Sequence, residues 1–154
     1  LDLEKPEAWR KNIAGHGSME VAAGTEGGIR FAFTFRSNAD NWAYPEARQE
    51  PPLDLSRYNA LRFEYRTSAA ESGPVRIMLV EQGGGTFFTS AGLAGTTEWK
   101  TATVLFESLS DLAMGQADPD GRLDTSRISV LRFGANCKPL ALTLEVRNVR
   151  AVKL

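Results

Sequence analysis

The fold of this chain is decided by residues 53–66, which read LDLSRYNALRFEYR. A short polar corner opens the stretch, and an alternating segment follows, with Leu61, Phe63 and Tyr65 on one side and Arg62, Glu64 and Arg66 on the other. This period of two predicts a strand over 60–66 with one buried and one wet face. The charged face is either plain solvated surface or the lining of a groove for a polar ligand.

Short apolar runs separated by turn residues fill the rest of the chain. The predicted strands are 18–23, 29–36, 60–66, 75–82, 86–91, 98–105 and 128–135, and a last strand or strand pair covers 140–154. Residues 107–113 have helix-like spacing, whereas 37–52 and 115–127 read as long polar loops. Many short strands without a long amphipathic helix predict an all-β fold, an antiparallel two-sheet β-sandwich. We expect a single domain over 1–154.

Composition excludes several classes of function. The chain has 154 residues with 18 basic and 19 acidic side chains, so nothing favours binding to nucleic acid. No apolar run approaches the roughly 20 residues of a membrane span. Cys137 and His16 are each the only residue of their kind, which leaves few options for a zinc site or a histidine-based triad. The chain starts at Leu1 without a signal-like segment, so we expect a module excised from a longer protein.

Four segments, in order, carry a resemblance to a known family. They are 54–63 (DLSRYNALRF), 97–104 (TEWKTATV), 120–128 (DGRLDTSRI) and 144–150 (LEVRNVR). Together they resemble the signature segments of non-catalytic carbohydrate-binding modules with the galactose-binding-like jelly roll. The resemblance implies binding of a polysaccharide or oligosaccharide by a module tethered to the catalytic domain of a secreted or cell-surface bacterial enzyme. It also implies that Trp99 is a core residue.

Candidate ligand contacts start in the first long loop, where Trp42 and Tyr44 stand among polar residues. Flat aromatic rings can stack on sugar faces, and long loops concentrate binding residues. The alternative is that Trp42 folds back and plugs the end of the sandwich.

Charged residues of the middle strands form a second candidate group. We expect Arg62 and Glu64 to share a face with Arg76 and Arg132, because a guanidinium fork suits vicinal hydroxyls or a uronate. The alternative is a ladder of cross-strand salt bridges, each worth little.

Adjacent aromatic residues follow the turn at 83–85. Phe87 and Phe88 must face opposite sides of a strand, so at most one lies in the core. We assign Phe87 to the ligand-binding residues.

A structural Ca²⁺ is common in the resembled modules, and the resemblance implies Glu20, Asn38, Asp40 and Glu145 as its candidate ligands. Acidic residues in 118–124 also alternate as in calcium loops, or they cap an ordinary turn.

Catalysis is not expected. A glycosidase needs two carboxylates facing across a groove, and only Glu64 and Glu81 lie on predicted central strands. No nucleophile elbow or phosphate loop is present. The alternative to a glycan-binding module is therefore a structural or protein-docking β-sandwich rather than an enzyme.

Overall fold

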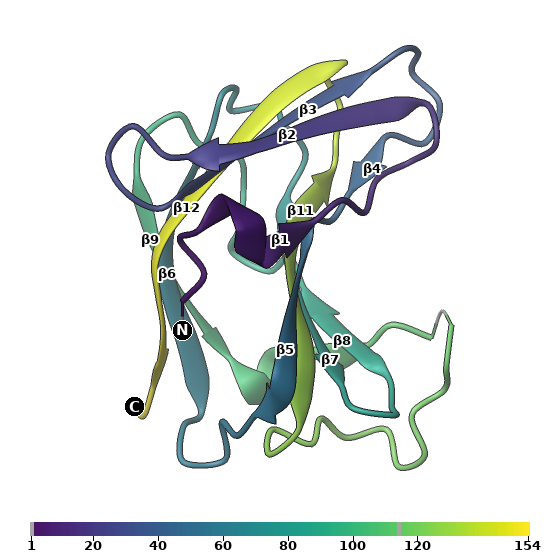
Figure 1. Cartoon of the computed structure of the whole chain (residues 1–154), viewed down its shortest axis with the longest axis vertical. Coiled ribbons are helices and arrows are strands. Elements are labelled where there is room, and N and C mark those ends of the chain that lie inside the picture. Colours follow the sequence, from purple (N-terminus) through teal and green to yellow (C-terminus); the bar gives the residue numbers. More distant parts are fainter. Residues whose placement is uncertain (1, 114) are drawn as a thin grey trace.

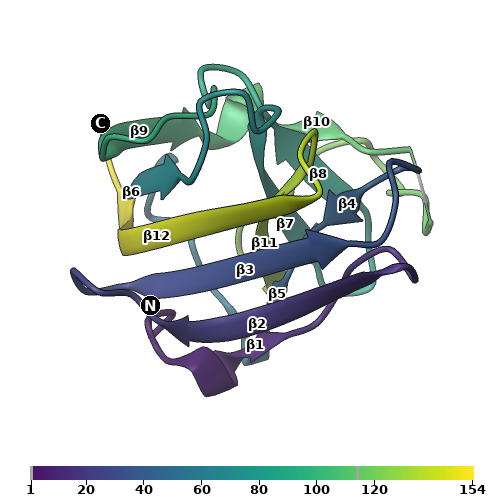
Figure 2. The same cartoon turned by 90° about the horizontal axis from the view of Figure 1, so that it is seen from above.

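Two antiparallel β-sheets packed face to face make up the protein (Figures 1 and 2). The computed structural model describes residues 2–113 and 115–154. Sheet A has the order β1 (Trp9–Arg10), β5 (Glu46–Leu53), β11 (Ile128–Asn136), β7 (Val75–Glu81), β8 (Thr86–Thr89) and β10 (Ser110–Asp111), and β4 (Trp42–Ala43) also pairs with β11. Sheet B has the order β2 (Gly17–Ala23), β3 (Ile29–Phe35), β12 (Ala141–Val152), β6 (Ala60–Thr67) and β9 (Lys100–Leu105). Two short 3-10 turns are η1 (Pro6–Ala8) and η2 (Phe106–Ser108).

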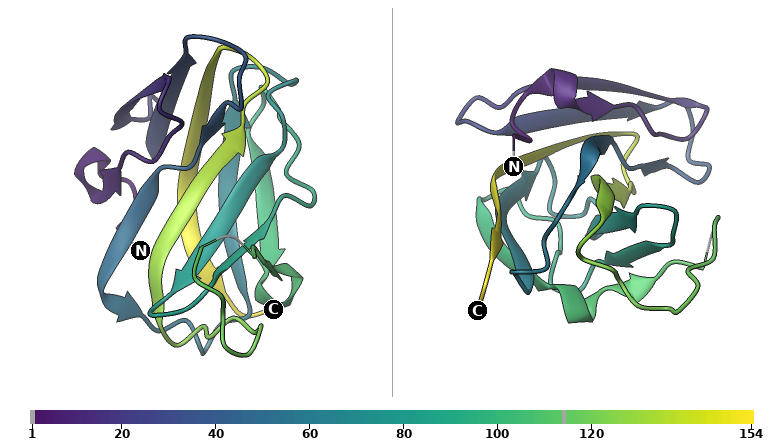
Figure 3. Two further views of the ribbon diagram at one scale, coloured as in Figure 1. Left: turned by 90° about the vertical axis from the view of Figure 1, so that its right-hand side faces the viewer. Right: turned by 60° about the horizontal axis from the view of Figure 1, so that its bottom comes forward.

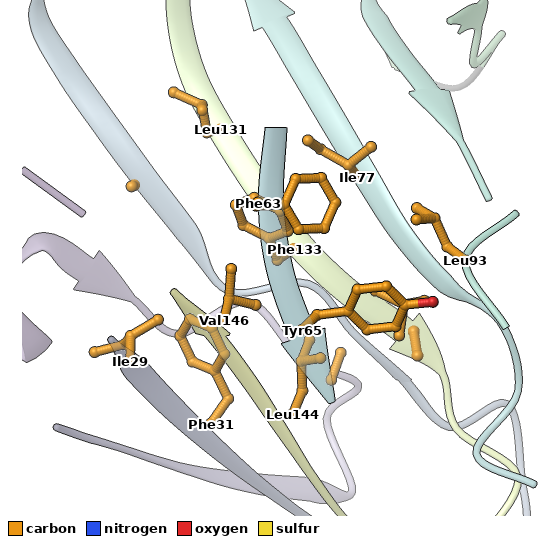
Figure 4. Packing of buried hydrophobic residues seen from close by; sticks show 14 of the residues in the cluster. Ile29, Phe31, Phe63, Tyr65, Ile77, Leu93, Leu131, Phe133, Leu144 and Val146 are labelled. Carbon is orange, nitrogen blue, oxygen red and sulfur yellow. The ribbon is translucent and has the colours of Figure 1, made fainter. Parts of the chain in front are cut away.

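The predicted antiparallel two-sheet sandwich is confirmed, and its core lies where the alternation placed it. Phe63 and Tyr65 of β6 point inward and are fully buried (Figure 4). The Phe63 ring meets the Phe133 ring of β11 edge to face at 5.0 Å, so it joins the two sheets. Trp9 packs in the same way on Phe31, with ring centroids 4.9 Å apart. Such aromatic pairs stabilise a core beyond the area that they bury.

The loop predicted over 37–52 is wrong, because this stretch contains β4 and β5. β5 contains few apolar residues that would reveal a strand in the sequence. One of them, Ala47, faces the core and pairs with Leu131 of the neighbouring strand β11. Pro51 and Pro52 lie within β5, just before its last residue, and in the sequence they argue against a strand. The structure accommodates them because β1 pairs only with Glu46 and Ala47, so the edge of β5 beyond Ala47 lacks that neighbour.

The ends of other elements also differ from the prediction. The predicted last strand or strand pair over 140–154 is one long strand, β12 (Ala141–Val152), whose register shifts at a bulge between Arg147 and Arg150. Asn148 in this bulge has a φ of 54°, the left-handed conformation that asparagine tolerates. The helix-like spacing of 107–113 is realised as η2 followed by the short strand β10.

Trp99 does not lie in the core, which corrects the expectation drawn from the resemblance. Its half-buried ring lies on the outer face of sheet B, where the guanidinium carbons of Arg147 and Arg66 stand 3.9 Å and 4.7 Å from its centroid. The indole N–H donates to Glu26. Cation–π contacts and this hydrogen bond give the ring a polar environment that a buried position would not supply.

Among the described residues, no helix is long and apolar enough to cross a membrane.

Candidate functional site

A cleft of about 490 Å³ lies on the outer face of sheet A, the face turned away from sheet B. Its wall includes Trp42, Tyr44, Arg76, Met78, Arg132 and Asn136. The segment after β10, drawn in green, extends beyond β8 at this side of the sandwich and contributes Leu112 (Figures 1 and 3). The structure therefore brings together the predicted residues Trp42, Tyr44, Arg76 and Arg132.

Strand register explains why these side chains share one face. In β7 the inward residues Ile77 and Leu79 are fully buried, so Arg76 and Met78 point outward. Met78 stands opposite Arg132 of β11 on one side and opposite Phe88 of β8 on the other. A row of outward side chains thus runs across three neighbouring strands.

Tyr44 lies flat against sheet A because β11 has a glycine beneath it. A Cβ atom on Gly134 would stand 1.9 Å from the carbonyl oxygen of Ala43 and 2.7 Å from Cδ1 of Tyr44. Asn12 fixes Tyr44 from the other side: its carbonyl accepts from the Tyr44 N–H at 2.9 Å, and its side-chain amide donates to the Tyr44 carbonyl at 3.0 Å. Any larger residue at 134 would push this segment away.

The phenol of Tyr44 is a fixed, neutral polar group. Its hydroxyl donates to Oδ1 of Asn136 at 2.5 Å, and only 6% of the residue is exposed. Burial raises the pKa of Tyr44 to about 12, so the phenol keeps its proton at physiological pH.

Trp42 extends this aromatic surface. Its ring lies nearly parallel to that of Tyr44, with an interplanar angle of 13° and centroids 6.5 Å apart. Trp42 is half-buried and packs partly against the core as well. The indole thus packs partly against the core and also lines the cleft, while its contact with a ligand stays a prediction.

Arg76 lies among aromatic rings. Its guanidinium carbon is 4.8 Å from the centroid of Phe88 and 5.9 Å from that of Tyr44, within the range of cation–π attraction. No acidic side chain of residues 2–113 and 115–154 forms an ion pair with it.

Arg132 is held differently, by a buried carboxylate. Glu46 accepts from Nε and Nη2 of Arg132 at 3.2 Å and 3.1 Å. Its other oxygen accepts from Nε and Nη2 of Arg48 at 3.0 Å and 2.8 Å. Glu46 is only 7% exposed, so this shared carboxylate orients Arg132 at the base of the cleft. Glu46 was not among the predicted site residues, because it lay in the supposed loop.

Arg62 and Glu64 do not share a face with Arg76 and Arg132, contrary to the prediction. They point outward from β6, which belongs to sheet B and pairs with β12 and β9. Glu64 accepts from Nε of Arg147 at 3.0 Å, and this contact lowers the pKa of Glu64. Alternation tells which side of a strand faces water but not which sheet the strand joins. A ligand contact at Arg62 and Glu64 stays a prediction, at a place separate from the cleft.

Phe87 is not on the outer face of sheet A. It is 2% exposed and stands opposite the buried Leu79, on the inner side of β8. Phe88 is the ring that reaches the cleft side, where it stacks with Arg76. The sequence required the two rings to face opposite ways, but it did not determine which of them faced outward.

The candidate calcium ligands lie on separate elements: Glu20 in β2, Asn38 and Asp40 in the loop before β4, and Glu145 in β12. Glu145 accepts from Nε of Arg66 at 2.6 Å, so an arginine already holds its carboxylate. Within the described part of the chain, no group of three or more His, Cys, Asp or Glu residues is placed to hold a metal ion. These residues do not fit a calcium site as a group, and the Ca²⁺ stays a prediction.

Acidic residues of 118–124 make turn contacts instead. Asp118 accepts from the backbone N–H of Asp120 and of Arg122 at 3.2 Å and 3.1 Å. Burial, and then the adjacent Asp118, raises the pKa of the Glu81 carboxyl, whereas contact with Glu81 lowers that of Asp118 to about 2. Glu81 therefore keeps its proton to a higher pH than Asp118 does. Glu81 lies in sheet A and Glu64 in sheet B, so these two acids do not face each other across a groove.

Comparison with known proteins supports the fold. No protein-family model and no curated protein sequence matches the chain. Among solved structures it is similar to the family 11 carbohydrate-binding module from Clostridium thermocellum, solved in complex with a β-1,3-1,4-mixed-linked tetrasaccharide. The two chains are 21% identical with a TM-score of 0.77, and the alignment covers 99% of this chain and 93% of that one.

Two further similar structures extend the comparison. The family 30 carbohydrate-binding module of the cellulosomal cellulase Cel9D-Cel44B of the same organism is 15% identical, with a TM-score of 0.62 and coverage of 95% and 91%. An exo-β-agarase is 15% identical with a TM-score of 0.64, and the match covers 99% of this chain but 24% of that one. The chain thus has the jelly-roll fold of carbohydrate-binding modules, which also occurs as one part of a larger agarase.

Proposed function

We propose that the protein is a non-catalytic carbohydrate-binding module and that the cleft on sheet A binds a polysaccharide or oligosaccharide. One observation carries the proposal: the stacked rings of Trp42 and Tyr44 and the guanidinium groups of Arg76 and Arg132 line the same cleft. The similarity in fold to a module solved with a bound tetrasaccharide supports it.

The chemistry of the cleft suits a sugar. A pyranose has faces of C–H bonds that pack on aromatic rings and an edge of hydroxyl groups that need hydrogen-bond partners. Trp42 offers the ring, while Arg132 and Asn136 offer polar groups beside it. Glu46 and Tyr44 fix these two polar residues in place, which reduces the entropy lost on binding.

As an accessory module, the protein would act by proximity. We infer that it is tethered to a catalytic domain of a secreted or cell-surface enzyme, as a matching domain is part of the longer agarase chain. Tethering raises the effective concentration of the catalytic domain at its substrate even if the module alone binds weakly. No catalytic step is assigned to the module itself.

Affinity electrophoresis against a broad panel of plant, algal and bacterial polysaccharides tests the proposal. We expect retardation by at least one polymer, and loss of that retardation in Trp42→Ala. Trp99→Ala is the matched control, because it removes the same side chain from the opposite sheet. Both variants should be shown to fold by thermal melting.

If no polysaccharide of the panel retards the protein, a structural or protein-docking domain is favoured. If Trp42→Ala and Trp99→Ala lose binding equally, the assignment of the binding site to the cleft is contradicted. New reducing ends or unsaturated products after incubation with a polymer would contradict a non-catalytic role.

A further inference from the structure

Arg76, like Arg30 of β3 but unlike three other half-buried arginines of the two sheets, has no carboxylate partner among the described residues. Arg132 is paired with Glu46, Arg66 with Glu145 and Arg147 with Glu64. Arg76 is half-buried too, yet in the described residues it has neither an ion pair nor a hydrogen bond of its guanidinium. A partly desolvated guanidinium with free N–H donors gains hydrogen bonds when a ligand brings acceptor oxygens.

The surroundings of Arg76 keep its hydrogen-bonding edge available. Phe88 and Tyr44 provide apolar contact, with ring centroids 4.8 Å and 5.9 Å from the guanidinium carbon. Contact with a ring face leaves the planar fork of N–H donors unsatisfied, and that fork matches the oxygens of a carboxylate or sulfate group. The Tyr44 hydroxyl donates to Asn136, and among the described residues no hydrogen bond joins Arg76 to Tyr44.

The charge of the cleft points the same way. Glu46 is shared between Arg48 and Arg132, so one carboxylate serves two guanidinium groups. Glu46 does not line the cleft; Asp40 is the only acid of the cleft wall within the described residues, and Arg76 does not pair with it. The cleft wall itself thus has two guanidinium groups, those of Arg76 and Arg132, and one carboxylate, that of Asp40, which favours an anionic ligand.

We propose that the cleft selects an acidic glycan and that Arg76 binds its anionic group, a carboxylate or a sulfate ester. This inference rests on the proposed function of the cleft and deepens it by naming the class of sugar. The aromatic surface of Trp42 holds the ring of the sugar, while the Arg76 fork binds the charged substituent.

Matched pairs of polymers test this proposal, because each pair differs mainly in charge. Polygalacturonate against its methyl ester reports on a carboxylate, and κ-carrageenan against its desulfated form reports on a sulfate ester. We expect the acidic member of one pair to bind at least about tenfold more tightly than its neutral partner, the size of a lost charge-assisted hydrogen bond. Added salt should reduce this preference.

Variants at Arg76 then assign the preference to that side chain. Arg76→Gln should abolish the preference, whereas Arg76→Lys, which keeps the charge but loses the fork, should retain part of it. Arg57→Gln is the control: it makes the same change in charge in the exposed loop after β5, outside the cleft wall. Melting temperatures of all the variants report on folding.

The outcomes separate the two proposals. If a neutral polymer binds as tightly as its acidic partner, or if Arg76→Gln weakens both equally, the inference is overturned while glycan binding by the cleft stands. If neither member of either pair binds while another, neutral polymer of the broad panel does, the inference is overturned and glycan binding by the cleft stands; if no polymer of the panel binds, both proposals fail.

Discussion

Replacing Gly134 by alanine is expected to lift Tyr44 off sheet A and so to damage the cleft. The added methyl group would stand 1.9 Å from the carbonyl oxygen of Ala43, whereas an ordinary contact needs about 3.4 Å. The Ala43 backbone must therefore move by about 1.5 Å, because the obstacle is main chain rather than a flexible side chain. That movement strains the pairing of Ala43 with Ala135 and the hydrogen bond between Tyr44 and Asn136.

Overpacking of this kind costs about 1 to 3 kcal/mol. For a chain of 154 residues, each kcal/mol lowers Tm by roughly 2 to 4 °C, so a scanning calorimeter resolves the change easily. The same variant should lose its retardation by the polysaccharide that retards the wild type.

Gly15→Ala is the matched control. Gly15 is exposed, a Cβ atom added to it would meet nothing within 4 Å, and its φ is not positive. The Tm and the binding of this variant should stay at wild-type values. Wild-type stability in Gly134→Ala, or equal damage in both variants, would refute the close approach of Tyr44 to β11.

Three further changes have defined expectations. Tyr44→Phe removes the hydroxyl that donates to Asn136 and should lower the unfolding free energy by about 1 kcal/mol, measured by urea titration. Glu81 has a raised pKa, so its contribution to stability is present below the ordinary value of 4.5 and is lost as pH rises through the raised value. Glu81→Gln, whose side chain is neutral at every pH, should therefore raise Tm at pH values above the raised pKa of Glu81 and lose this advantage below pH 4.5; an equal effect throughout this range would contradict the raised pKa. Phe133→Ala should cost about 3 to 5 kcal/mol, since the ring is fully buried against Phe63 and Trp9; a loss below 1 kcal/mol in chemical denaturation would be inconsistent with this packing.

Sequence periodicity predicted the layers of this fold well, because strand alternation is a local property. Phe63 and Tyr65 are inside and Arg62 and Glu64 are outside, as the pattern required. The sequence did not predict β5, because one face of this strand carries charged residues and two prolines lie near its C-terminal end. Its place in sheet A comes from pairing with β11, which lies about 80 residues further along the chain and leaves no local signal.

The candidate site was only partly predictable for the same reason. Residue type identified Trp42, Tyr44, Arg76 and Arg132, and the fold gathered them in one cleft. Arg62 has the same chemistry, but the strand order places it on the other sheet. Nothing local to Gly134 indicates that Tyr44 lies across it, although the two are in contact in the folded chain.

An NMR titration with an oligosaccharide of the polymer that binds tests the central claim most directly. If the cleft on sheet A is the binding site, the largest amide shifts will occur at Tyr44, Arg76, Arg132 and Asn136, and the outer face of sheet B will be unaffected. Shifts centred on Arg62 and Arg150 instead, with the cleft residues unchanged, would contradict the assignment of sugar binding to this cleft.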